Sequence, residues 1–218
     1  EPDDDEYDEY DDDDDMVTVA DPWEDFNRDM YWFNDTLYFV LLKPVAQGLK
    51  AVIPIEERTC IRNAFYNIRF PARFINSVLQ AKWSKAGDEV AAFCLNSTVG
   101  FLGIADVASS QPGLKTSPED TGQTFAVWGT GQGIYLTLPF FGPTTVRDGI
   151  GRVGDTVMDP LFWLIDDTYV SIGLGFGEVG NDTSLRIGDY EAIKKAAFDP
   201  YVAIRNGYIQ NRNKLIGE

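Results

Sequence analysis

The stretch from residue 121 to residue 146, TGQTFAVWGTGQGIYLTLPFFGPTTV, constrains the fold more than any other part of the sequence. Its 26 residues carry no charge, and an uncharged helix of that length could cross a bilayer. Glycines and prolines break any such helix, and irregular backbone facing hydrocarbon would leave amide groups without hydrogen bonds. We therefore expect this stretch to be buried in protein, either as the wall of a cavity or as an ordinary core loop. The interrupting residues are Gly122, Gly129, Gly131, Gly133, Pro139, Gly142 and Pro143.

Three of these glycines, Gly129, Gly131 and Gly133, alternate with other residues in the middle of the stretch. A phosphate-binding loop places a lysine and then a serine or threonine after its glycines, and this cluster lacks that pair. Glycine permits positive φ and a close approach of the backbone. The cluster therefore predicts a hairpin or hinge.

Upstream of this stretch, apolar side chains recur at helical spacing directly after Asp21-Pro22. The pattern predicts a helix from Asp21 to Leu42, with Asp21 as its N-cap and Lys43-Pro44 as its end. The second half of this helix is apolar on nearly all sides, which is unusual for a surface helix of a soluble protein. The periodic residues are Trp23, Phe26, Met30, Phe33, Leu37 and Leu41.

Elsewhere helical patterns dominate, so the sequence predicts an all-α, predominantly helical domain over residues 21–218. An uncharged window at 90–105 holds 16 residues and is shorter than the ~20 residues that span a bilayer. The further elements expected are helices over 55–80 with a break at Pro71, from about 88, over 158–165 and over 189–215, an extended segment over 169–176, and a loop over 177–188.

The composition is that of a folded acidic protein, with 218 residues, 44% of them hydrophobic, and a net charge of -17. Residues 1–15 carry 12 of the 35 acidic side chains and none of the 18 basic ones, which leaves 23 against 18, or -5, for the rest. We expect residues 1–20 to form a disordered tail or tether. A nucleic-acid partner is excluded, because the basic surface that neutralises phosphates is missing.

The sequence contains no histidine, which removes the usual general base and the commonest zinc ligand. The adjacent carboxylates Glu119-Asp120 and Asp166-Asp167 are interpreted as loop or helix-cap residues rather than as a catalytic pair, with Ser117 as N-cap of a helix beginning there. Cys60 and Cys94 lie in apolar stretches and are expected to be buried thiols, with a single disulfide as the alternative.

Two further features leave alternatives open. Gly175, Gly177 and Gly180 have the spacing of a dinucleotide fingerprint but no βαβ context, so we predict a flexible loop there. The numbered chain opens without a basic segment followed by an apolar one. It is therefore either a cytosolic protein or a secreted protein whose signal precedes residue 1.

Taken together, the motifs between residues 21 and 212 resemble those of the MlaA/VacJ family in order and approximate spacing. The matching residues are Asp21 to Arg28, Phe33-Asn34, Lys43 to Ala46, Arg62-Asn63, Asn67, Pro71, Asn76, Leu79-Gln80, Phe93, Asn96, Gly100, Gly103, Asp106, Glu119 to Thr124, Trp128-Gly129, Gly133 to Tyr135, Leu138-Pro139, Gly142-Pro143, Arg147-Asp148, Asp199 to Tyr201, Arg205, Tyr208 and Arg212. The family's acylated N-terminal cysteine has no counterpart in the numbered chain.

The resemblance implies an outer-membrane lipoprotein of phospholipid transport, shaped as a helical ring in the periplasmic leaflet with a central amphipathic channel. Such a protein removes mislocalised phospholipids from the outer leaflet and passes them to a periplasmic lipid-carrier protein, usually beside a trimeric porin. It implies no enzymatic reaction, cofactor or metal. The alternative left open is a soluble helical periplasmic interaction protein without lipid transport.

Within this framework we predict a hairpin over 128–142 that borders the channel, and we predict that its glycines set a gate. The first helix is expected to lie in the membrane plane, because charges at its centre oppose spanning. The predicted channel residues are Trp128, Gly129, Gly131, Gly133, Tyr135, Leu138, Pro139, Phe140, Phe141 and Gly142, and the predicted membrane-facing residues are Trp23, Phe26, Phe33, Leu37 and Leu41.

Overall fold

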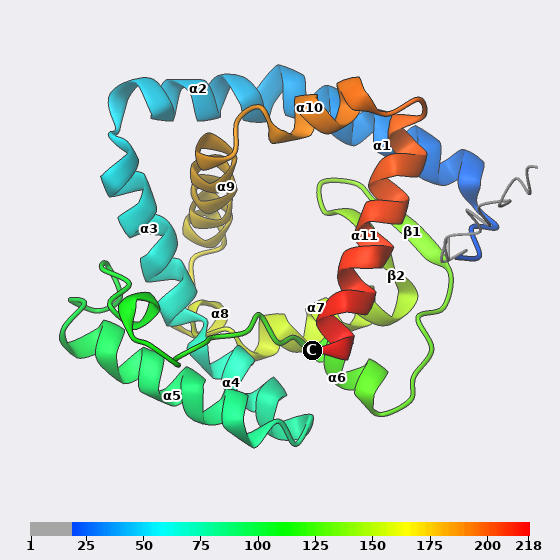
Figure 1. Cartoon of the computed structure of the whole chain (residues 1–218). Helices are drawn as coiled ribbons and strands as arrows, with labels where there is room; N and C mark the ends of the chain where they lie inside the picture. Colours follow the sequence, from blue (N-terminus) through cyan, green and yellow to red (C-terminus); the bar gives the residue numbers. More distant parts are fainter. Residues whose placement is uncertain (1–18) are drawn as a thin grey trace, which may run out of the picture.

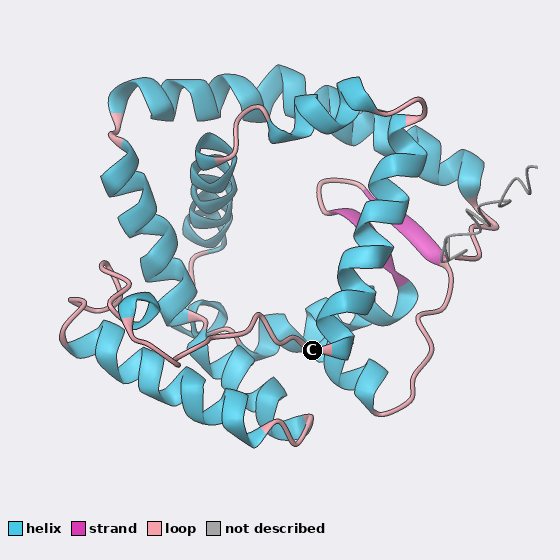
Figure 2. Cartoon of the chain, in the orientation of Figure 1, coloured by secondary structure: helices cyan, strands magenta, loops and turns pink. Residues whose placement is uncertain are grey.

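The computed structural model describes residues 19–218, and within them helices dominate and one short hairpin supplies the strands (Figure 2). The elements are α1 Glu24–Leu37, the π-helical turn η1 Tyr38–Leu42, α2 Lys43–Val52, α3 Ile55–Ile68, α4 Phe70–Leu79, α5 Trp83–Thr98, the 3-10 turn η2 Ala108–Ser110, α6 Thr121–Val127, β1 Tyr135–Leu138, β2 Gly142–Thr145, α7 Val146–Met158, α8 Pro160–Leu164, α9 Thr168–Leu185, α10 Asp189–Ala196 and α11 Pro200–Gly217.

These helices follow one another around a ring-like frame (Figure 1). One side consists of α1, η1 and α2, the next of α3, and the third of α4 and α5, while α6, α7 and α11 complete the outline. In this view α9 and the turn of the β1–β2 hairpin lie inside the outline, and α9 packs against α2 and α3. The prediction of a predominantly helical, ring-like domain is confirmed.

The first side of the frame is longer than predicted, because Lys43-Pro44 does not end the helix. Backbone dihedrals stay helical from α1 through η1 into α2, which ends only at Ile53, before Pro54. Pro44 lies in the first turn of α2, directly after the π-helical turn. A π-helical turn widens the backbone locally, which makes room for a residue without an N–H donor.

The predicted N-cap role of Asp21 is also wrong. The helix begins at Glu24, after Trp23, and the carboxylate of Asp21 binds residues far along the chain instead. It accepts hydrogen bonds from Tyr201 Oη at 2.5 Å and from Arg205 Nη1 at 2.9 Å, both on α11. Asp21 therefore joins the start of the described chain to its last helix.

The helices α3, α4 and α5 follow the predicted pattern with shifted ends. The break expected at Pro71 is confirmed, since α3 ends at Ile68 and Pro71 lies in the first turn of α4. The next helix, α5, begins at Trp83, earlier than the predicted start near residue 88. The last helical region begins at Asp189 as predicted and ends at Gly217, but it is divided into α10 and α11, with Asp199 as N-cap of α11 and Pro200 at its first position.

The largest error concerns residues 168–185, predicted as an extended segment and a flexible loop but folded as the helix α9. Asp167 caps its first turn by accepting hydrogen bonds from the N–H groups of Tyr169 and Val170. The glycines of α9 lower its intrinsic helix propensity, and packing against α2 and α3 outweighs that penalty. At Gly180 an added Cβ would lie 3.5 Å from Val45 and Leu49, which shows how closely α9 approaches α2.

Aspartate carboxylates cap four of the described helices, α6, α8, α9 and α11. Asp120, rather than the predicted Ser117, is the N-cap of α6 and accepts a hydrogen bond from the N–H of Gln123. Asp167 has the same role in α9. The short helix α8, with Asp159 as its cap, lies inside the predicted range 158–165.

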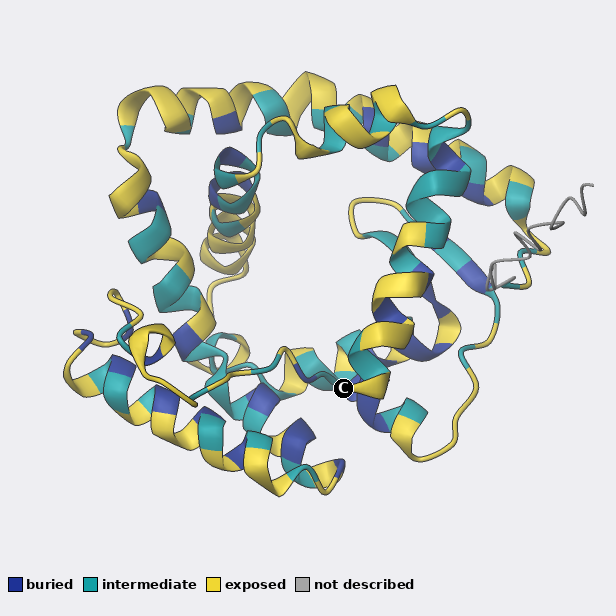
Figure 3. Cartoon of the chain, in the orientation of Figure 1, coloured by how far each residue is buried: buried dark blue, intermediate teal, exposed yellow. Residues whose placement is uncertain are grey.

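Burial is distributed in an unusual way: many polar side chains are buried and many large hydrophobic ones are exposed. Buried and exposed positions alternate along most of the helices (Figure 3). The buried hydrophobic cluster is small and consists of Tyr31, Tyr135, Tyr201 and Ile209. Exposed side chains include Val52 at 82%, Phe101 at 79% and Tyr169 at 86%. Large exposed apolar areas are typical of surfaces that contact a membrane or another protein.

Hydropathy gives a separate result for the helices of residues 19–218. No single one is both long enough and apolar enough to cross a membrane. The continuous helix 24–52 and the helix Ile55–Ile68, bent by 119°, satisfy that length and composition criterion only as a pair.

Two remaining predictions concern the cysteines and the acidic tail. Cys60 and Cys94 are free thiols, and Cys94 is exposed on α5, so the prediction of two buried cysteines is wrong. The helical register places Cys94 on the outer side of α5, whereas Ala92 and Asn96 are buried. The predicted tail 1–20 lies outside the described residues except for its last two.

Candidate functional site

An apolar pocket of about 480 Å³ lies between the continuous first side of the frame, the turn of the hairpin and α9. Its lining contains no charged side chain. Both its volume and its apolar walls are typical of sites that accommodate a small molecule or part of a larger apolar one. The lining residues are Leu37, Leu42, Phe140, Phe141, Ile172, Gly175, Phe176 and Val179.

The hairpin that supplies two of these residues pairs β1 with β2 in antiparallel register, from Tyr135 opposite Thr145 to Leu138 opposite Gly142. It is therefore shifted from the predicted range 128–142. Phe140 in its turn has φ of 68°, in the left-handed region that non-glycine residues seldom adopt. A surrounding contact has to hold such a residue in place.

Asn34 of α1 provides that contact. Its Oδ1 accepts a hydrogen bond from the Phe140 N–H at 2.8 Å, and its Nδ2 donates to the Leu138 carbonyl at 2.9 Å. The ring of Phe33 also packs edge to face on Phe140, with centroids 5.3 Å apart. The hairpin turn is thus fixed to α1, and Phe140 and Phe141 border the pocket.

Asn27 repeats the same contact seven residues earlier on α1. It accepts a hydrogen bond from the Thr137 N–H at 2.7 Å and donates to the Tyr135 carbonyl at 3.2 Å. A spacing of seven places Asn27 and Asn34 on one face of the helix. Their amides satisfy backbone groups of β1, which would otherwise form an open edge of a two-stranded sheet.

A second pocket, of about 450 Å³, lies on the other side of α9, against α2 and α3. Its lining is apolar except for Glu178 and Asn181. Glu178 forms an ion pair with Arg69, which also donates to Asp159 at 2.9 Å. Arg69 therefore joins the α3–α4 break to both α8 and α9. The apolar lining is Val45, Leu49, Ile53, Ile61, Phe65, Gly173, Leu174, Phe176 and Gly177.

The glycines of α9 account for the space on its two sides. A Cβ atom added at Gly173, Gly175 or Gly177 would meet no other atom within 4 Å. Each of these glycines lines one of the two pockets. Their lack of side chains keeps the pockets open, which gives this glycine-rich helix a role unrelated to a dinucleotide.

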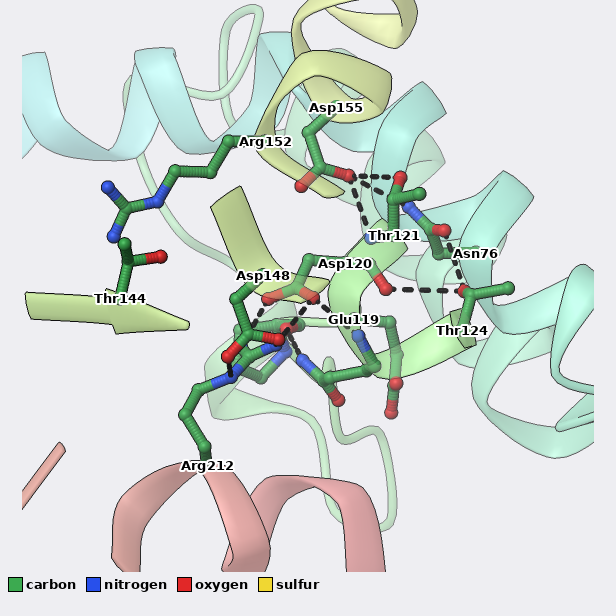
Figure 4. A network of polar contacts seen from close by, with 12 residues as sticks. Asn76, Glu119, Asp120, Thr121, Thr124, Thr144, Asp148, Arg152, Asp155 and Arg212 are labelled. Atoms are coloured by element: carbon green, nitrogen blue, oxygen red, sulfur yellow. Dashed lines mark hydrogen bonds and ion pairs between the residues drawn. The ribbon is translucent and has the colours of Figure 1, made fainter. Parts of the chain in front are cut away.

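The opposite corner of the frame is held by a buried polar network (Figure 4). Arg212 of α11 donates to both carboxylate oxygens of Asp120, at 2.5 and 2.9 Å, and to both of Asp148, at 3.1 Å each. A side chain at Gly122 would clash with this group, since its Cβ would lie 2.6 Å from Asp148 Oδ1. The network joins α6, α7 and α11.

Electrostatics in this network favour its ionised form. Burial alone raises the pKa of Asp148, but the hydrogen bond from Tyr208 and the charge of Arg212 outweigh burial, so this pKa lies below its ordinary value. Burial and the hydrogen bond to Asp148 raise the pKa of the Tyr208 phenol. Burial lowers the pKa of the Arg212 guanidinium, but the hydrogen bonds to the two carboxylates outweigh burial, so this pKa lies above its ordinary value. Ion pairs therefore join α6, α7 and α11 at this corner of the frame.

A second part of the same network connects α4 to α6 and α7. Asp155 accepts hydrogen bonds from the backbone and side chain of Thr121, at 2.9 and 2.7 Å. Asn76 donates to Asp155 at 3.2 Å and accepts from Thr124 at 2.7 Å. Residues 121–124 of the uncharged stretch are accordingly buried in the protein among polar groups.

The structure separates the predicted channel residues into different environments. Phe140 and Phe141 line the apolar pocket, whereas Tyr135 is 1% exposed and belongs to the core cluster. Trp128 lies at the end of α6, where its Nε1 donates to the Leu79 carbonyl at 3.0 Å. Leu138, Pro139 and Gly142 form or flank the hairpin turn, and Gly129, Gly131 and Gly133 lie between α6 and β1.

The predicted membrane-facing residues of the first helix are exposed with one exception. Trp23, Phe26, Phe33 and Leu41 are each at least 41% exposed. Leu37 is half-buried and lines the apolar pocket, so it points inward. Sequence reasoning missed the contribution of α9, because its glycines and apolar residues do not repeat with a clear helical period.

The frame, its apolar pockets and its exposed apolar outer surface define a class of protein that handles apolar or amphipathic ligands. A family model described as MlaA lipoprotein matches residues 19–215. The chain therefore belongs to the MlaA lipoprotein family.

Individual relatives agree with this assignment. The chain is 33% identical to the intermembrane phospholipid transport system lipoprotein MlaA of Shigella flexneri, over 89% of this chain and 77% of the relative. It is 28% identical to the protein of the same name in Haemophilus influenzae, over 88% and 77%. An uncharacterized protein of Rickettsia conorii is 32% identical, over 87% and 75%.

A solved structure has the same fold. It is described as "Structural basis for maintenance of bacterial outer membrane lipid asymmetry" and matches with a TM-score of 0.79 and 30% identity. The match covers 90% of this chain and 99% of that chain.

Proposed function

We propose that this protein is a non-enzymatic phospholipid channel at the outer membrane, which removes mislocalised phospholipids from the outer leaflet and passes them to a periplasmic lipid carrier. The observation that carries the proposal is the uncharged apolar pocket between the hairpin turn and α9. Acyl chains leave water favourably for such a surface. Membership of the MlaA lipoprotein family and the names of its relatives support a role in phospholipid transport at this membrane.

The burial pattern supports a position within one leaflet. Polar side chains tie the helices together inside the protein, and large hydrophobic side chains face outward. Acyl chains would cover this outer surface without a helix crossing the bilayer. A trimeric porin, the partner that the family resemblance implies, would cover a further part of it.

The proposal is tested by measuring bound lipid. The protein is purified from membranes in mild detergent, and its lipids are extracted and quantified by mass spectrometry. We expect phospholipid to remain bound through purification, because the pocket and the outer surface both remove acyl chains from water. A lipid-free, monodisperse protein in plain buffer would overturn the proposal.

The glycines before the hairpin lead to a prediction about the gate. At Gly131 an added Cβ atom meets no other atom within 4 Å and φ is not in the left-handed region, so we expect Gly131→Val to fold. Valine restricts the backbone motion at residue 131 that the proposed gate requires. We expect a severalfold rise in surface phospholipid, measured by cleavage with an added phospholipase in cells whose only copy is the variant.

A matched control for this substitution is Gly87→Val on α5, also at an open position but remote from the hairpin. It should leave surface phospholipid unchanged. Normal transport by a folded Gly131→Val protein would remove the basis for the gate.

The first side of the frame leads to a second prediction, that the helix over residues 24–42 lies in the membrane plane. At ~1.5 Å per residue, the segment 24–42 alone is close in length to the ~30 Å thickness of the hydrocarbon core. Its length therefore permits either orientation, and its charged residues decide between spanning the bilayer and lying in its plane. Each charged residue at the bilayer centre would cost ~2.5–3.5 kcal/mol, and Asp25, Arg28, Asp29 and Asp35 interrupt the segment. Spin labels along 24–42 in lipid bilayers should report similar shallow depths with a helical period. A steady passage through the midplane would refute this orientation.

A further inference from the structure

A polar pocket of about 300 Å³ adjoins the apolar one at the end of α9, where α9 meets η1 and α10. Its volume is at the lower end of the range for small-molecule sites. Val179 lines both pockets, so the two adjoin at this residue. The lining residues are Tyr38, Val179, Asp182, Thr183, Arg186, Asp189 and Tyr190.

One face of α9 changes from apolar to polar along its length. The residues of α9 and its C-cap Arg186 that line the two pockets follow one another at intervals of one or three, which keeps them on one side of the helix. The apolar half, from Ile172 to Val179, and the polar half, from Val179 to Arg186, each span about 10 Å at ~1.5 Å per residue. This order, apolar and then polar, is the order of an acyl chain and its headgroup. The residues are Ile172, Gly175, Phe176, Val179, Asp182, Thr183 and Arg186.

Most charges around the polar pocket are already neutralised. Lys43 pairs with Glu191 at 2.9 Å, and Lys194 pairs with Asp35 at 2.7 Å. The hydroxyl of Tyr38 donates to Glu191 at 2.9 Å, which with burial raises the pKa of that phenol to about 12. The phenol therefore stays protonated at neutral pH and keeps donating to Glu191.

Three charged side chains of the pocket remain available. In residues 19–218, neither Asp182, Arg186 nor Asp189 takes part in an ion pair. A guanidinium group binds phosphate oxygens through paired N–H donors, and carboxylates bind ammonium groups. The pocket thus offers one cationic and two anionic contacts.

We propose that this pocket binds the headgroup of an amine-bearing zwitterionic phospholipid, with Arg186 on the phosphate and with Asp182 and Asp189 on the ammonium group. The acyl chains then lie in the adjoining apolar pocket, so the assignment rests on the proposed function. A headgroup with a phosphate and no amine would meet two unpaired carboxylates. The site therefore selects zwitterionic over anionic phospholipid.

The test exposes the detergent-purified protein to mixed micelles that hold phosphatidylethanolamine and phosphatidylglycerol in equal amounts, with identical acyl chains. Retained lipid is quantified by mass spectrometry after repurification. We expect the protein to retain phosphatidylethanolamine about threefold over phosphatidylglycerol, the size of effect that a partly exposed ion pair produces. Asp182→Asn combined with Asp189→Asn should remove this preference, while Arg186→Gln should reduce retention of both lipids.

Lys195→Gln is the matched control, because Lys195 is an exposed cation of α10 that does not line the pocket. It should leave both quantities unchanged. Equal retention of the two lipids by the unmodified protein, or unchanged values in the pocket variants, overturns the headgroup site but leaves lipid transport standing. Retention of neither lipid overturns the proposed function itself. If soluble glycerophosphoethanolamine displaced all of the retained lipid, the pocket would be a site for the free headgroup. That result would also overturn the proposal that the pocket selects a lipid.

Discussion

Replacing Arg212 by methionine should lower the free energy of unfolding by about 3–5 kcal/mol, the cost of breaking a buried ion pair, because Asp148 then keeps only Arg147 as a cationic partner and Asp120 keeps none among the described residues. Arg212 is the only side chain of residues 19–218 that forms ion pairs with both Asp120 and Asp148. For a chain of this length the melting temperature should fall by about 6–20 °C. The measurement is thermal unfolding in detergent, followed by circular dichroism.

Lys214→Met on the same helix is the control for charge and side-chain length. Lys214 is 73% exposed and its ion pair with Glu218 is long, at 3.8 Å, so the melting temperature should change little. Arg212→Lys keeps the charge but loses the paired donors, and it should give an intermediate melting temperature. Equal stability of Arg212→Met and Lys214→Met would show that the network does not hold the frame together.

Gly175→Trp should abolish lipid transport almost completely while the protein remains folded. Gly175 lines the apolar pocket, and a Cβ added there meets no atom within 4 Å. An indole ring at this position occupies the space that acyl chains would use. Tryptophan also favours a helical backbone more than glycine does, so α9 should not lose stability. The measurement is surface phospholipid, determined by phospholipase cleavage in cells whose only copy is the variant.

Gly87→Trp adds the same ring at an open, exposed position of α5 and serves as the control. It should transport lipid normally. If Gly175→Trp is folded and also transports normally, the lipid path does not pass through this pocket. Circular dichroism and melting temperature of the purified variant establish that it is folded.

The helical class, the break at Pro71 and the capping role of Asp167 can be predicted because each depends on local chemistry, whereas the predicted caps Asp21 and Ser117 are wrong. A proline in a first turn and an aspartate before a helix have the same effect in most contexts. Pro44 and α9 were mispredicted because distant contacts decide them. The π-helical turn accommodates Pro44, and packing against α2 and α3 stabilises the glycine-rich α9.

Part of the candidate site can also be predicted from local sequence, and part depends on the folded chain. Phe140 and Phe141 follow from a hairpin in an uncharged stretch, and both line the pocket. Tyr135 was misplaced because alternation along a strand depends on register, and the strand begins at Tyr135 rather than near Trp128. Asn27 and Asn34 belong to the family motif, but only the folded chain shows that they hold β1.

The contrast between a polar interior and an apolar exterior has a thermodynamic consequence. A folded domain usually gains stability, and its large heat-capacity change on unfolding, by removing its own apolar side chains from water. Here the buried hydrophobic cluster is small, and residues such as Val52, Phe101 and Tyr169 stay on the surface. Intramolecular packing alone therefore accounts for a smaller share of that heat-capacity change. In the proposed position within one leaflet, the surrounding lipid would act as the missing part of the core, so folding and membrane association would draw on the same hydrophobic free energy.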